Sequence, residues 1–531
     1  MRVGIVGAGV LGLAAAKVLQ ERGHEVTIFE GRPGVGGQVV TFQVAGQELE
    51  CFYHHLFTND TVAIRYIEEM GYGPKMRWIE SKTAMLRGGK IFPFVTPLDL
   101  LRYTPVSLIG RMRLGAAAVW LRRQKDWHKY EGVTARSWME RAVGAKAFEG
   151  VCGPLLRGKF ADQADNVGMT WLWGKVYLRF ASRKGKGGMK EQLGYLQGSF
   201  GQYIEELGRR VAAAGAEIKL NCQVDEVAVT DGRVKGIRAG GQLHEFDHVL
   251  MTTPNIITKK IAPELPRDYV AVLDRVRYQW ATCLVLALDR PLSDTYWLSI
   301  ADPLPFVACI EHTNFMPPEE YGGNHIVYLS NYMSPGNPLL DLPVEEVFER
   351  YLSGIHTINP QFDRSWVKQM WLFKDPGGQP VITTNYSRSI PSMRTGIEGS
   401  TWRTRRRSTR RTAARTTACG SASRWRTSWT GTPGRQCSRS RFRERASRGH
   451  RNGVNRGNAG AGCCMTPPGR EARWRRRLQT SGGRCLALRA VHAFRRRGHS
   501  RPYKYSDGGA GRSRGASAHP PAPAGFAPSR R

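Results

Sequence analysis

Three glycines near the start of the chain have the spacing of a phosphate-binding turn. They lie in the segment MRVGIVGAGVLGLAAAKVLQERGHEVTIFE. A turn of this kind lets the backbone approach a pyrophosphate, and the next helix directs N–H groups and a partial positive charge toward it. An acidic residue at the end of the second strand can accept hydrogen bonds from ribose hydroxyl groups. The segment therefore predicts a dinucleotide site, whose contacts would be Gly7, Gly9, Val10, Leu11, Gly12 and Glu30.

The elements expected around these residues form a βαβ unit. Residues 2–6 are a β-branched run typical of a buried strand, residues 11–22 have apolar residues at helical spacing, and residues 24–30 form a second strand. This is the context that the glycine motif requires. The terminal Glu30 favours an unphosphorylated ribose, as in FAD or NAD, over that of NADP. The alternative is a structural turn in an unrelated α/β protein.

The residues after Glu30 distinguish between the two dinucleotides. The segment EGRPGVGGQ has the pattern E-x-R-x-x-x-G-G. It resembles the FAD-binding extension of the FAD-dependent amine oxidase and protoporphyrinogen oxidase superfamily. In that superfamily the paired glycines pass close to the phosphates of the flavin nucleotide, and the arginine lies nearby. The resemblance implies that the cofactor is FAD, and that its further contacts are Gly31, Arg32, Gly36 and Gly37.

Residues 198–254 are similar to a second stretch of the same superfamily. We expect an amphipathic helix over 203–214 and a strand over 224–230, followed by an Asp-Gly hairpin turn. In the superfamily, the residue that matches Val224 holds the adenine through its backbone, and the strand end at Thr253 lies near the dinucleotide. A core valine is an equally good interpretation of Val224.

The resemblance covers residues 1–399 and implies an α/β fold with two interleaved domains. A Rossmann-like FAD-binding domain of the GR2 type would take residues 1–80 and 195–265, and a substrate domain of mixed β-sheet and helices would take 81–194 and 266–399. The implied reaction is hydride transfer from a C–N or C–C bond of a small-molecule substrate to FAD. The superfamily also contains carotenoid desaturases and a non-redox sugar mutase, so the fold leaves the reaction open.

Cations alternate with aromatic residues in the first substrate segment. They are Arg157, Lys159, Trp171, Trp173, Lys175, Arg179 and Arg183. Such residues suit an anionic or ring-bearing substrate, through paired hydrogen bonds and stacking. The alternative is a solvated basic face with the tryptophans in the core. His54 and His55 fall where the superfamily chain passes the flavin and could tune the flavin or shuttle a proton, although a lone pair of this kind is more often structural. The sequence identifies no catalytic acid or base.

Charge is distributed unevenly along the 531 residues, whose net charge is +35. Residues 400–531 contain 33 Lys and Arg against 3 Asp and Glu, whereas residues 1–399 contain 46 against 41. Any attraction to polyanions therefore rests on the last segment. Because that segment has no hydrophobic period, we expect it to be a disordered tail. An arginine-rich arm that binds nucleic acid is the alternative.

The last FAD motif of the superfamily, approximately L-x-L-A-N followed by Y-P-E-D-R-G, is absent. One codon choice for residues 399–421, GSTWRTRRRSTRRTAARTTACGS, gives LHLANATQIYPEDRGTNYSVRL when it is read from the last base of the Gly399 codon. A frameshift near residue 400 explains both the missing motif and a tail with 32 Arg and one Lys. It implies no evolved nucleic-acid partner, and the loss of part of the flavin cradle could leave this chain inactive or poor in cofactor.

The cysteines of residues 1–399 are scattered without a ligand spacing, which favours reduced thiols and predicts no metal site. The sequence begins directly with a strand, so we expect no signal peptide. No apolar run approaches the roughly 18 residues that span a bilayer. These features favour a cytoplasmic protein without integral membrane association. The short run LGAAAVWL is flanked by arginines and leaves a peripheral membrane contact open.

Overall fold

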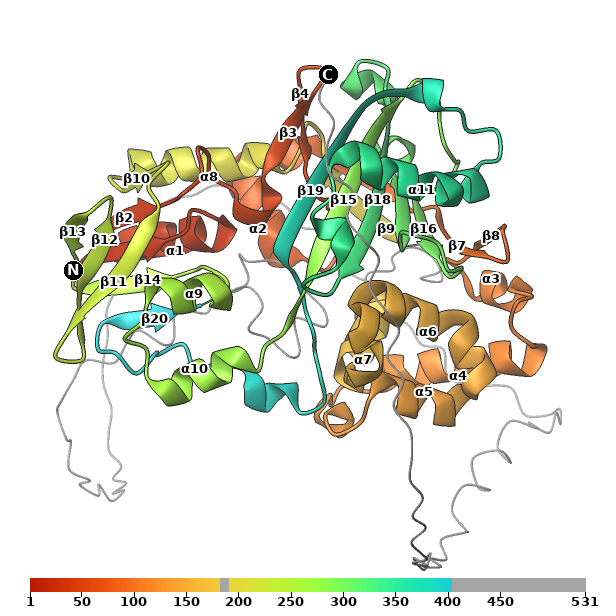
Figure 1. Cartoon of the computed structure of the whole chain (residues 1–531), viewed down its shortest axis with the longest axis horizontal. Coiled ribbons are helices and arrows are strands. Elements are labelled where there is room, and N and C mark those ends of the chain that lie inside the picture. The colour runs from red at the N-terminus through yellow and green to blue at the C-terminus, as the bar shows by residue number, and fades with distance from the viewer. Residues whose placement is uncertain (182–190, 404–531) are drawn as a thin grey trace, which may run out of the picture. The chain divides into compact units, whose positions relative to one another are not determined.

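The computed structural model describes residues 1–181 and 191–403 of the chain (Figure 1). Within these ranges the strands form five sheets, of which two position the candidate site. The chain begins with β1 (Arg2–Val6), α1 (Val10–Gln20) and β2 (Glu25–Phe29), which together form the predicted βαβ unit. β1 and β2 are parallel, with Val3 opposite Val26.

The first of the two sheets is a five-stranded parallel sheet. Its strands, in spatial order, are β10 (Glu217–Lys219), β2, β1, β14 (His248–Met251) and β20 (Ser400–Trp402). The side chains of β1 are buried on both faces from Val3 onward, as expected of a parallel sheet that is covered on both sides. Val3 and Ile5 pack with α1 and with α8 (Gly201–Ala213) on one face.

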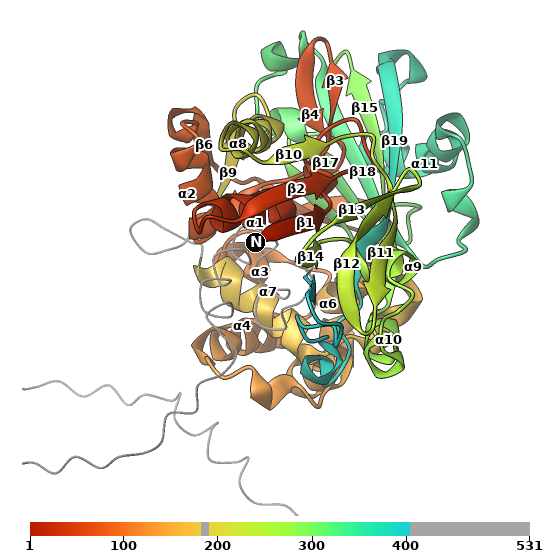
Figure 2. The same cartoon turned by 90° about the vertical axis from the view of Figure 1, so that its left-hand side faces the viewer.

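The opposite face of this sheet is covered by a three-stranded antiparallel sheet (Figure 2). Its strands are β11 (Val224–Thr230), β12 (Arg233–Ala239) and β13 (Gln242–Glu245). Val6 and Phe29 pack there with Val227 and Ile237. Because successive side chains of a strand point to opposite faces, the short β1 contributes to both cores.

The second large sheet has seven strands and is mixed. Its order is β19 (Val367–Pro380), β15 (Tyr278–Leu288), β18 (His325–Met333), β17 (Ala308–Glu311), β16 (Trp297–Ile300), β7 (Thr83–Arg87) and β8 (Lys90–Pro93). β16 and β7 are parallel and the other neighbours are antiparallel. The sheet therefore draws strands from both predicted substrate segments.

β15 joins two cores, because its side chains alternate between the faces of the sheet. Cys283, Val285 and Ala287 belong to the core that also contains α1 and α8. Leu284, Leu286 and Leu288 belong to a separate core, which α11 (Val344–Ile358) covers. The candidate site lies on the first of these two sides.

A group of helices forms a further layer with its own core (Figure 1). It consists of α3 (Pro97–Arg102), α4 (Leu108–Arg123), α5 (Ala135–Val143), α6 (Ala145–Phe160) and α7 (Met169–Ala181). The other elements are β3 (Thr41–Val44), β4 (Gln47–Glu50), β5 (Leu56–Phe57), α2 (Thr61–Glu69), β6 (Met76–Glu80), β9 (Gln192–Leu196), α9 (Asn255–Ile261) and α10 (Arg267–Asp274). No helix of the described ranges is both long and apolar enough to cross a membrane.

The α/β fold class is confirmed, and the predicted elements shift only at their ends. The helix expected over 203–214 is α8, two residues earlier at its start. The Asp-Gly turn after β11 is present, with both Asp231 and Gly232 at positive φ, as a type I′ hairpin turn requires. The domain boundaries stay predictions.

The start of the predicted tail needs a correction. The sequence places it at residue 400, whereas Ser400–Trp402 form β20, which is parallel to β14. The reason is physical: backbone pairing tolerates many side chains, and Trp402 is buried in the core beneath the sheet. The disorder predicted for the rest of the tail, from residue 404 onward, lies outside the described residues.

Candidate functional site

The turn between β1 and α1 accepts only glycine at two positions. Gly7 has a φ of +102°, and a Cβ there would lie 2.7 Å from the Thr252 hydroxyl oxygen. A Cβ on Gly12 would lie 2.0 Å from the carbonyl oxygen of Gly7. The helix therefore begins directly against the turn, at the carboxyl edge of the parallel sheet, where open α/β sheets bind ligands.

A second glycine loop lies beside the first. Gly36 donates its N–H to the carbonyl of Ala8 at 3.1 Å. Gly37 has a φ of +64°, and a Cβ on it would lie 3.0 Å from the Cα of Gly9. Gly9 is also the N-cap of α1 and carries no side chain to cap the first N–H groups. The helix start is thus a site for an anion, between two backbones that approach without intervening side chains.

Glu30 ties the two glycine loops together. One carboxylate oxygen accepts the N–H of Ala8 at 2.8 Å, and the other accepts the N–H of Arg32 at 3.1 Å. Each oxygen has a second lone pair, so the half-buried carboxylate can still accept from a ribose hydroxyl. The exposed Arg32 donates from Nη1 to the carbonyl of Gly37 at 3.1 Å, which holds the second loop in place.

Three other predicted contacts, Gly31, Val224 and Thr253, come from the Glu30 loop and from later strands. A Cβ on Gly31 would lie 3.7 Å from the Cα of Gln223, so Val224 begins β11 next to the Glu30 loop. The Val224 side chain itself is buried in a core. The hydroxyl of Thr253 lies 2.8 Å from that of Thr258 in α9, while its Cγ2 would lie 3.9 Å from a Cβ on Gly7.

Thr252 is the threonine that contacts the glycine turn. Its hydroxyl donates to the carbonyl of Val6 at 2.7 Å and lies 3.2 Å from that of Gly7. The two adjacent threonines at the end of β14 differ in the direction of their side chains. The strand register, which puts Met251 opposite Val6, decides between them.

On the substrate side, the structure gathers cations and tyrosines from distant segments. Lys159 Nζ lies 2.5 Å from the hydroxyl of Tyr332 and 3.9 Å from the centre of its ring. The Tyr332 hydroxyl in turn lies 3.3 Å from that of Tyr53. α6 contributes the lysine, β18 the first tyrosine, and the loop after β4 the second. The sequence pointed to Lys159 but gave no signal for either tyrosine.

Lys175 belongs to the same group of charges. Burial, followed by repulsion from Lys159 and Arg179, lowers the pKa of Lys175 to about 7. The side chain nevertheless keeps accessible surface. Lys175 also lies 5.6 Å from the ring centre of Trp171.

The other candidate side chains have more ordinary environments. Arg157 forms an ion pair with Glu149 at 2.8 Å, and Arg179 lies 3.8 Å from Glu191. Trp171 and Trp173 are buried in the helical core, as the alternative interpretation expected. The candidate Arg183 lies outside the described residues.

The two histidines differ in their surroundings. His55 lies 3.2 Å from the Tyr296 hydroxyl and packs edge-on against Phe57 and Trp297. Burial, helped by Arg179, lowers the pKa of His55 to about 3, so its ring is neutral at physiological pH. His54 Nδ1 lies 2.5 Å from the carbonyl of Phe52. The surroundings of His55 fit a positioning role better than proton transfer at neutral pH.

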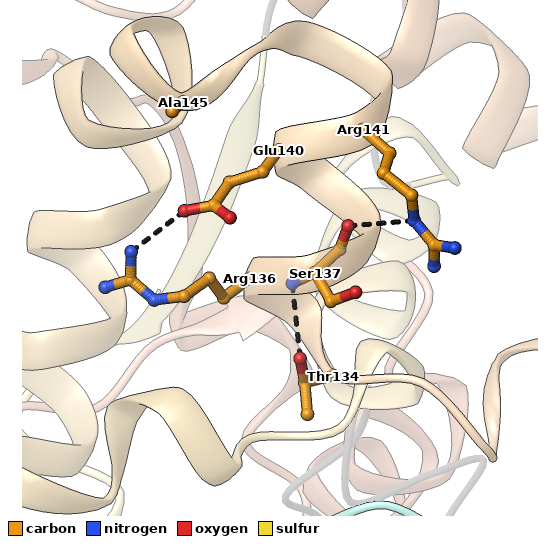
Figure 3. Close-up of a pocket in the computed structure, with 6 residues that line it drawn as sticks. All are labelled: Thr134, Arg136, Ser137, Glu140, Arg141 and Ala145. Atoms are coloured by element: carbon orange, nitrogen blue, oxygen red, sulfur yellow. Dashed lines mark hydrogen bonds and ion pairs between the residues drawn. The ribbon is translucent and has the colours of Figure 1, made fainter. Parts of the chain in front are cut away.

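A surface pocket at α5 does not belong to this site. Its volume is about 370 Å³, and it is lined by Thr134, Arg136, Ser137, Glu140, Arg141 and Ala145 (Figure 3). Arg136 in it is paired with Glu140 at 3.0 Å and with Asp165 at 2.6 Å, and Arg141 donates to the carbonyl of Ser137 at 3.1 Å. Among the described residues, no group of three acidic, histidine or cysteine side chains could hold a metal ion.

The sheet order and the paired glycine loops define a dinucleotide-binding flavoprotein. The chain matches the family model of flavin containing amine oxidoreductases over residues 12–402, and it belongs to that family. Among curated proteins, it is similar to AofH of Mycobacterium tuberculosis, which is described as a flavin-containing monoamine oxidase. The two are 25% identical over 309 residues, a match that spans 55% of this chain and 65% of the relative.

Solved structures show the same fold. A protein from Exiguobacterium sp. 255-15, described as a protoporphyrinogen oxidase, matches with a TM-score of 0.63 and 18% identity, over 80% of this chain and 98% of that one. A reduced UDP-galactopyranose mutase matches with a TM-score of 0.62 and 14% identity, over 79% of this chain and 92% of that one. At these identities the likeness concerns the fold alone.

FAD is the cofactor of the family, and the described residues fit its nucleotide half. Any Cβ at Gly12 or Gly37 would disturb the two loops, whose close approach leaves only backbone to face a pyrophosphate. Glu30 retains acceptor capacity for a ribose. The contacts of individual residues with FAD stay predictions, as does the part of the site that the motif after residue 403 would supply.

Proposed function

We propose that this protein is an FAD-dependent oxidoreductase that oxidises a small, anionic, ring-bearing substrate. The observation that carries the proposal is the pair of glycine loops, Gly7–Gly12 and Gly36–Gly37, that meet without side chains at the start of α1. Family membership supports the same chemistry. When bound, FAD supplies the hydride acceptor, and the protein's residues position the substrate and exclude water.

The proposed nature of the substrate is supported by the charges around Lys175. Lys159 and Arg179 are its cationic neighbours, while Asp60 is the acid that partly offsets them. A carboxylate or phosphate beside Lys175 would relieve the repulsion among the cations and return the pKa of Lys175 toward its usual range. Tyr53 and Trp297, whose ring centres lie 4.9 Å apart, offer aromatic surface to a ring.

The proposed acid–base behaviour follows from the two pKa values. His55 stays neutral above about pH 3. Its ring then donates a hydrogen bond from one nitrogen and accepts one at the other. Lys175 is half protonated near pH 7. An anionic substrate pairs with the protonated form, so its binding should weaken as the pH rises through about 7. A substrate amine would instead be repelled by the same ammonium group.

The test is anaerobic mixing of the yellow protein with a panel of amines and of ring compounds that carry carboxylate or phosphate groups. A substrate removes the colour of the oxidised flavin. We expect an anionic compound to do so, and we expect Lys175→Met to raise its KM at least tenfold with a smaller change in kcat and to flatten the pH dependence. Lys90→Met, at an exposed hairpin position of β8, serves as the control and should change neither.

The alternative outcomes separate the two parts of the proposal. If only uncharged compounds or simple amines reduce the flavin, and Lys175→Met has no effect, the oxidoreductase stands and the anionic substrate is wrong. If a sugar nucleotide is rearranged without net loss of colour, the non-redox reaction of a flavin mutase replaces the oxidoreductase.

We also infer that the protein works in a reducing compartment such as the cytoplasm. The five cysteines within the described residues are all unbridged, and four of them are buried. Burial raises the pKa of Cys152 to about 12, which keeps its thiol protonated and unreactive. Fractionation of cells that express the tagged protein, against a periplasmic marker, tests the location.

A further inference from the structure

Exposed large apolar side chains are concentrated on α3 and α4. Of the fifteen such residues in the described ranges, seven lie between residues 98 and 120. They are Leu98, Leu101, Leu108, Ile109, Met112, Val119 and Trp120, with exposed fractions from 46% to 68%. We call these seven residues the α3–α4 patch. Single exposed apolar residues need no explanation, but a concentration of this kind marks an interaction surface.

The patch lies on the face of α4 that points away from the protein. The inner face is defined by Gly110, Leu114, Ala117 and Leu121, whose spacing of three and four residues follows one side of a helix and which are buried. Leu108, Met112 and Val119 lie on the opposite side and are all exposed. Ile109 and Trp120 lie on the flanks of this outer face and are exposed as well. A surface helix normally places polar residues on its outer face, whereas α4 places apolar residues there.

The patch is surrounded by positive charge. Arg102 ends α3, and the exposed Arg113, Arg122 and Arg123 lie on α4. α4 itself contains no acidic residue. The acid of α3, Asp99, is held at the start of its own helix, where its carboxylate accepts the N–H groups of Val95 and Thr96. The nearest exposed acid along the chain is Asp126, which follows Lys125.

We propose that the α3–α4 patch docks on the surface of an anionic lipid bilayer. Apolar side chains enter the boundary between headgroups and acyl chains, a tryptophan prefers that depth, and arginines pair with lipid phosphates. Each cation near an anionic leaflet adds to the attraction. α4 has 16 residues and is therefore about 24 Å long, so it would lie in the interface rather than cross it.

Charge favours the bilayer over a second copy of this chain as the occupant. A symmetric dimer through α4 would bring the same patch of both copies together and would oppose Arg113, Arg122 and Arg123 with their own equivalents. An anionic membrane neutralises these cations instead. The proposal does not depend on the reaction that the protein catalyses, since none of the patch residues lies among the candidate cofactor or substrate contacts.

The test compares two double variants of the full chain in vesicle sedimentation. Ile109→Glu/Met112→Glu changes the patch, whereas Ile256→Glu/Ile257→Glu changes two similarly exposed residues of α9. Vesicles of phosphatidylcholine, with or without phosphatidylglycerol, are used above physiological salt, where exposed charges are screened beyond roughly 8 Å. Both variants keep the basic residues from 404 onward, so any binding that these supply is common to them.

We expect the patch variant to bind phosphatidylglycerol vesicles at least tenfold more weakly than the wild type and the α9 variant to bind unchanged. Arg122→Gln/Arg123→Gln should weaken binding several-fold and lower its salt dependence. Bromine-labelled lipid should quench less fluorescence in Trp120→Phe than in the wild type. These two milder variants decide the question if the glutamates disturb folding.

Three results would overturn the proposal. The patch and α9 variants could bind equally well, which would assign vesicle binding to other basic residues. Binding could be the same with and without phosphatidylglycerol, which would remove the role of the arginines. Sedimentation equilibrium could reveal a dimer that Ile109→Glu/Met112→Glu dissociates, without any affinity for vesicles, which would make a second copy the occupant.

Discussion

Single glycines set the tightest constraints in the molecule. At Gly12 an added methyl group would meet a carbonyl oxygen at 2.0 Å, and backbone cannot retreat as a flexible side chain can. At Gly34, in the neighbouring loop, a Cβ would meet nothing within 4 Å. The same substitution at these two positions should therefore have very different effects.

We expect Gly12→Ala to shift α1 away from its turn and to prevent retention of flavin. The free energy of unfolding should fall by about 1–3 kcal/mol, the usual cost of overpacking. Gly34→Ala should leave both properties unchanged. Thermal unfolding and the flavin absorbance of the purified proteins measure the two effects. Equal melting temperatures for the two variants would contradict the close contact of Gly12 with Gly7.

At this scale the sequence predicted the backbone contacts better than the side-chain contacts. The glycines and Glu30 follow from a local pattern in which spacing alone fixes the turn, the helix start and the strand end. Tyr53 and Tyr332 could not be found in this way, because 279 residues separate them and only the packing of β18 against the loop after β4 brings them together.

At the scale of elements, β20 is the most informative. It has three residues, yet it extends the parallel sheet beyond β14 with Val249 opposite Ser400. Trp402 is 2% exposed, and its indole N–H donates to the carbonyl of Thr253 at 3.1 Å. The strand is held by one large side chain and a few backbone hydrogen bonds.

We therefore expect Trp402→Ala to destabilise the protein by about 3–5 kcal/mol, the usual cost of deleting a buried aromatic side chain. Met112→Ala, at a position with 62% exposure, should change stability by less than about 0.5 kcal/mol. Urea unfolding followed by circular dichroism compares the two. A small effect at Trp402 would mean that β20 contributes little to the sheet.

The boundary of β20 also illustrates what the sequence hides. Ser400, Thr401 and Trp402 read as the start of an arginine-rich segment because they share its composition. The strand forms because β14 presents an unpaired edge, and pairing there depends on the backbone more than on side chains. The hydrophobic periods over residues 11–22 and 203–214 predicted α1 and α8 to within two residues at each end.

At the scale of the whole molecule, the main prediction concerns residues 399–421. Deletion of one base near codons 399–400 accounts for the loss of a motif that would continue from β20 toward the flavin. Restoring the frame should give a chain that retains about one FAD, whereas the chain with the arginine-rich segment should retain less. Flavin released by denaturation measures the ratio, and resequencing the gene tests the deletion directly.

The control for this prediction is the restored chain that carries Gly12→Ala, which should lose FAD again. If the restored frame does not raise the flavin content, the missing motif is not what limits binding. An uninterrupted reading frame through Arg531 in an independent sequence of the gene would refute the deletion itself.

The alternation of β15 has a consequence for motion. Cys283, Val285 and Ala287 of this strand belong to one core, and Leu284, Leu286 and Leu288 belong to another. Separation of the two layers would therefore expose apolar side chains of both cores to water. The two layers should consequently melt together in a single transition, with no hinge between them. Substrate must then enter by rearrangement of side chains or of the helical layer, and not by the jaw-like opening of two rigid lobes.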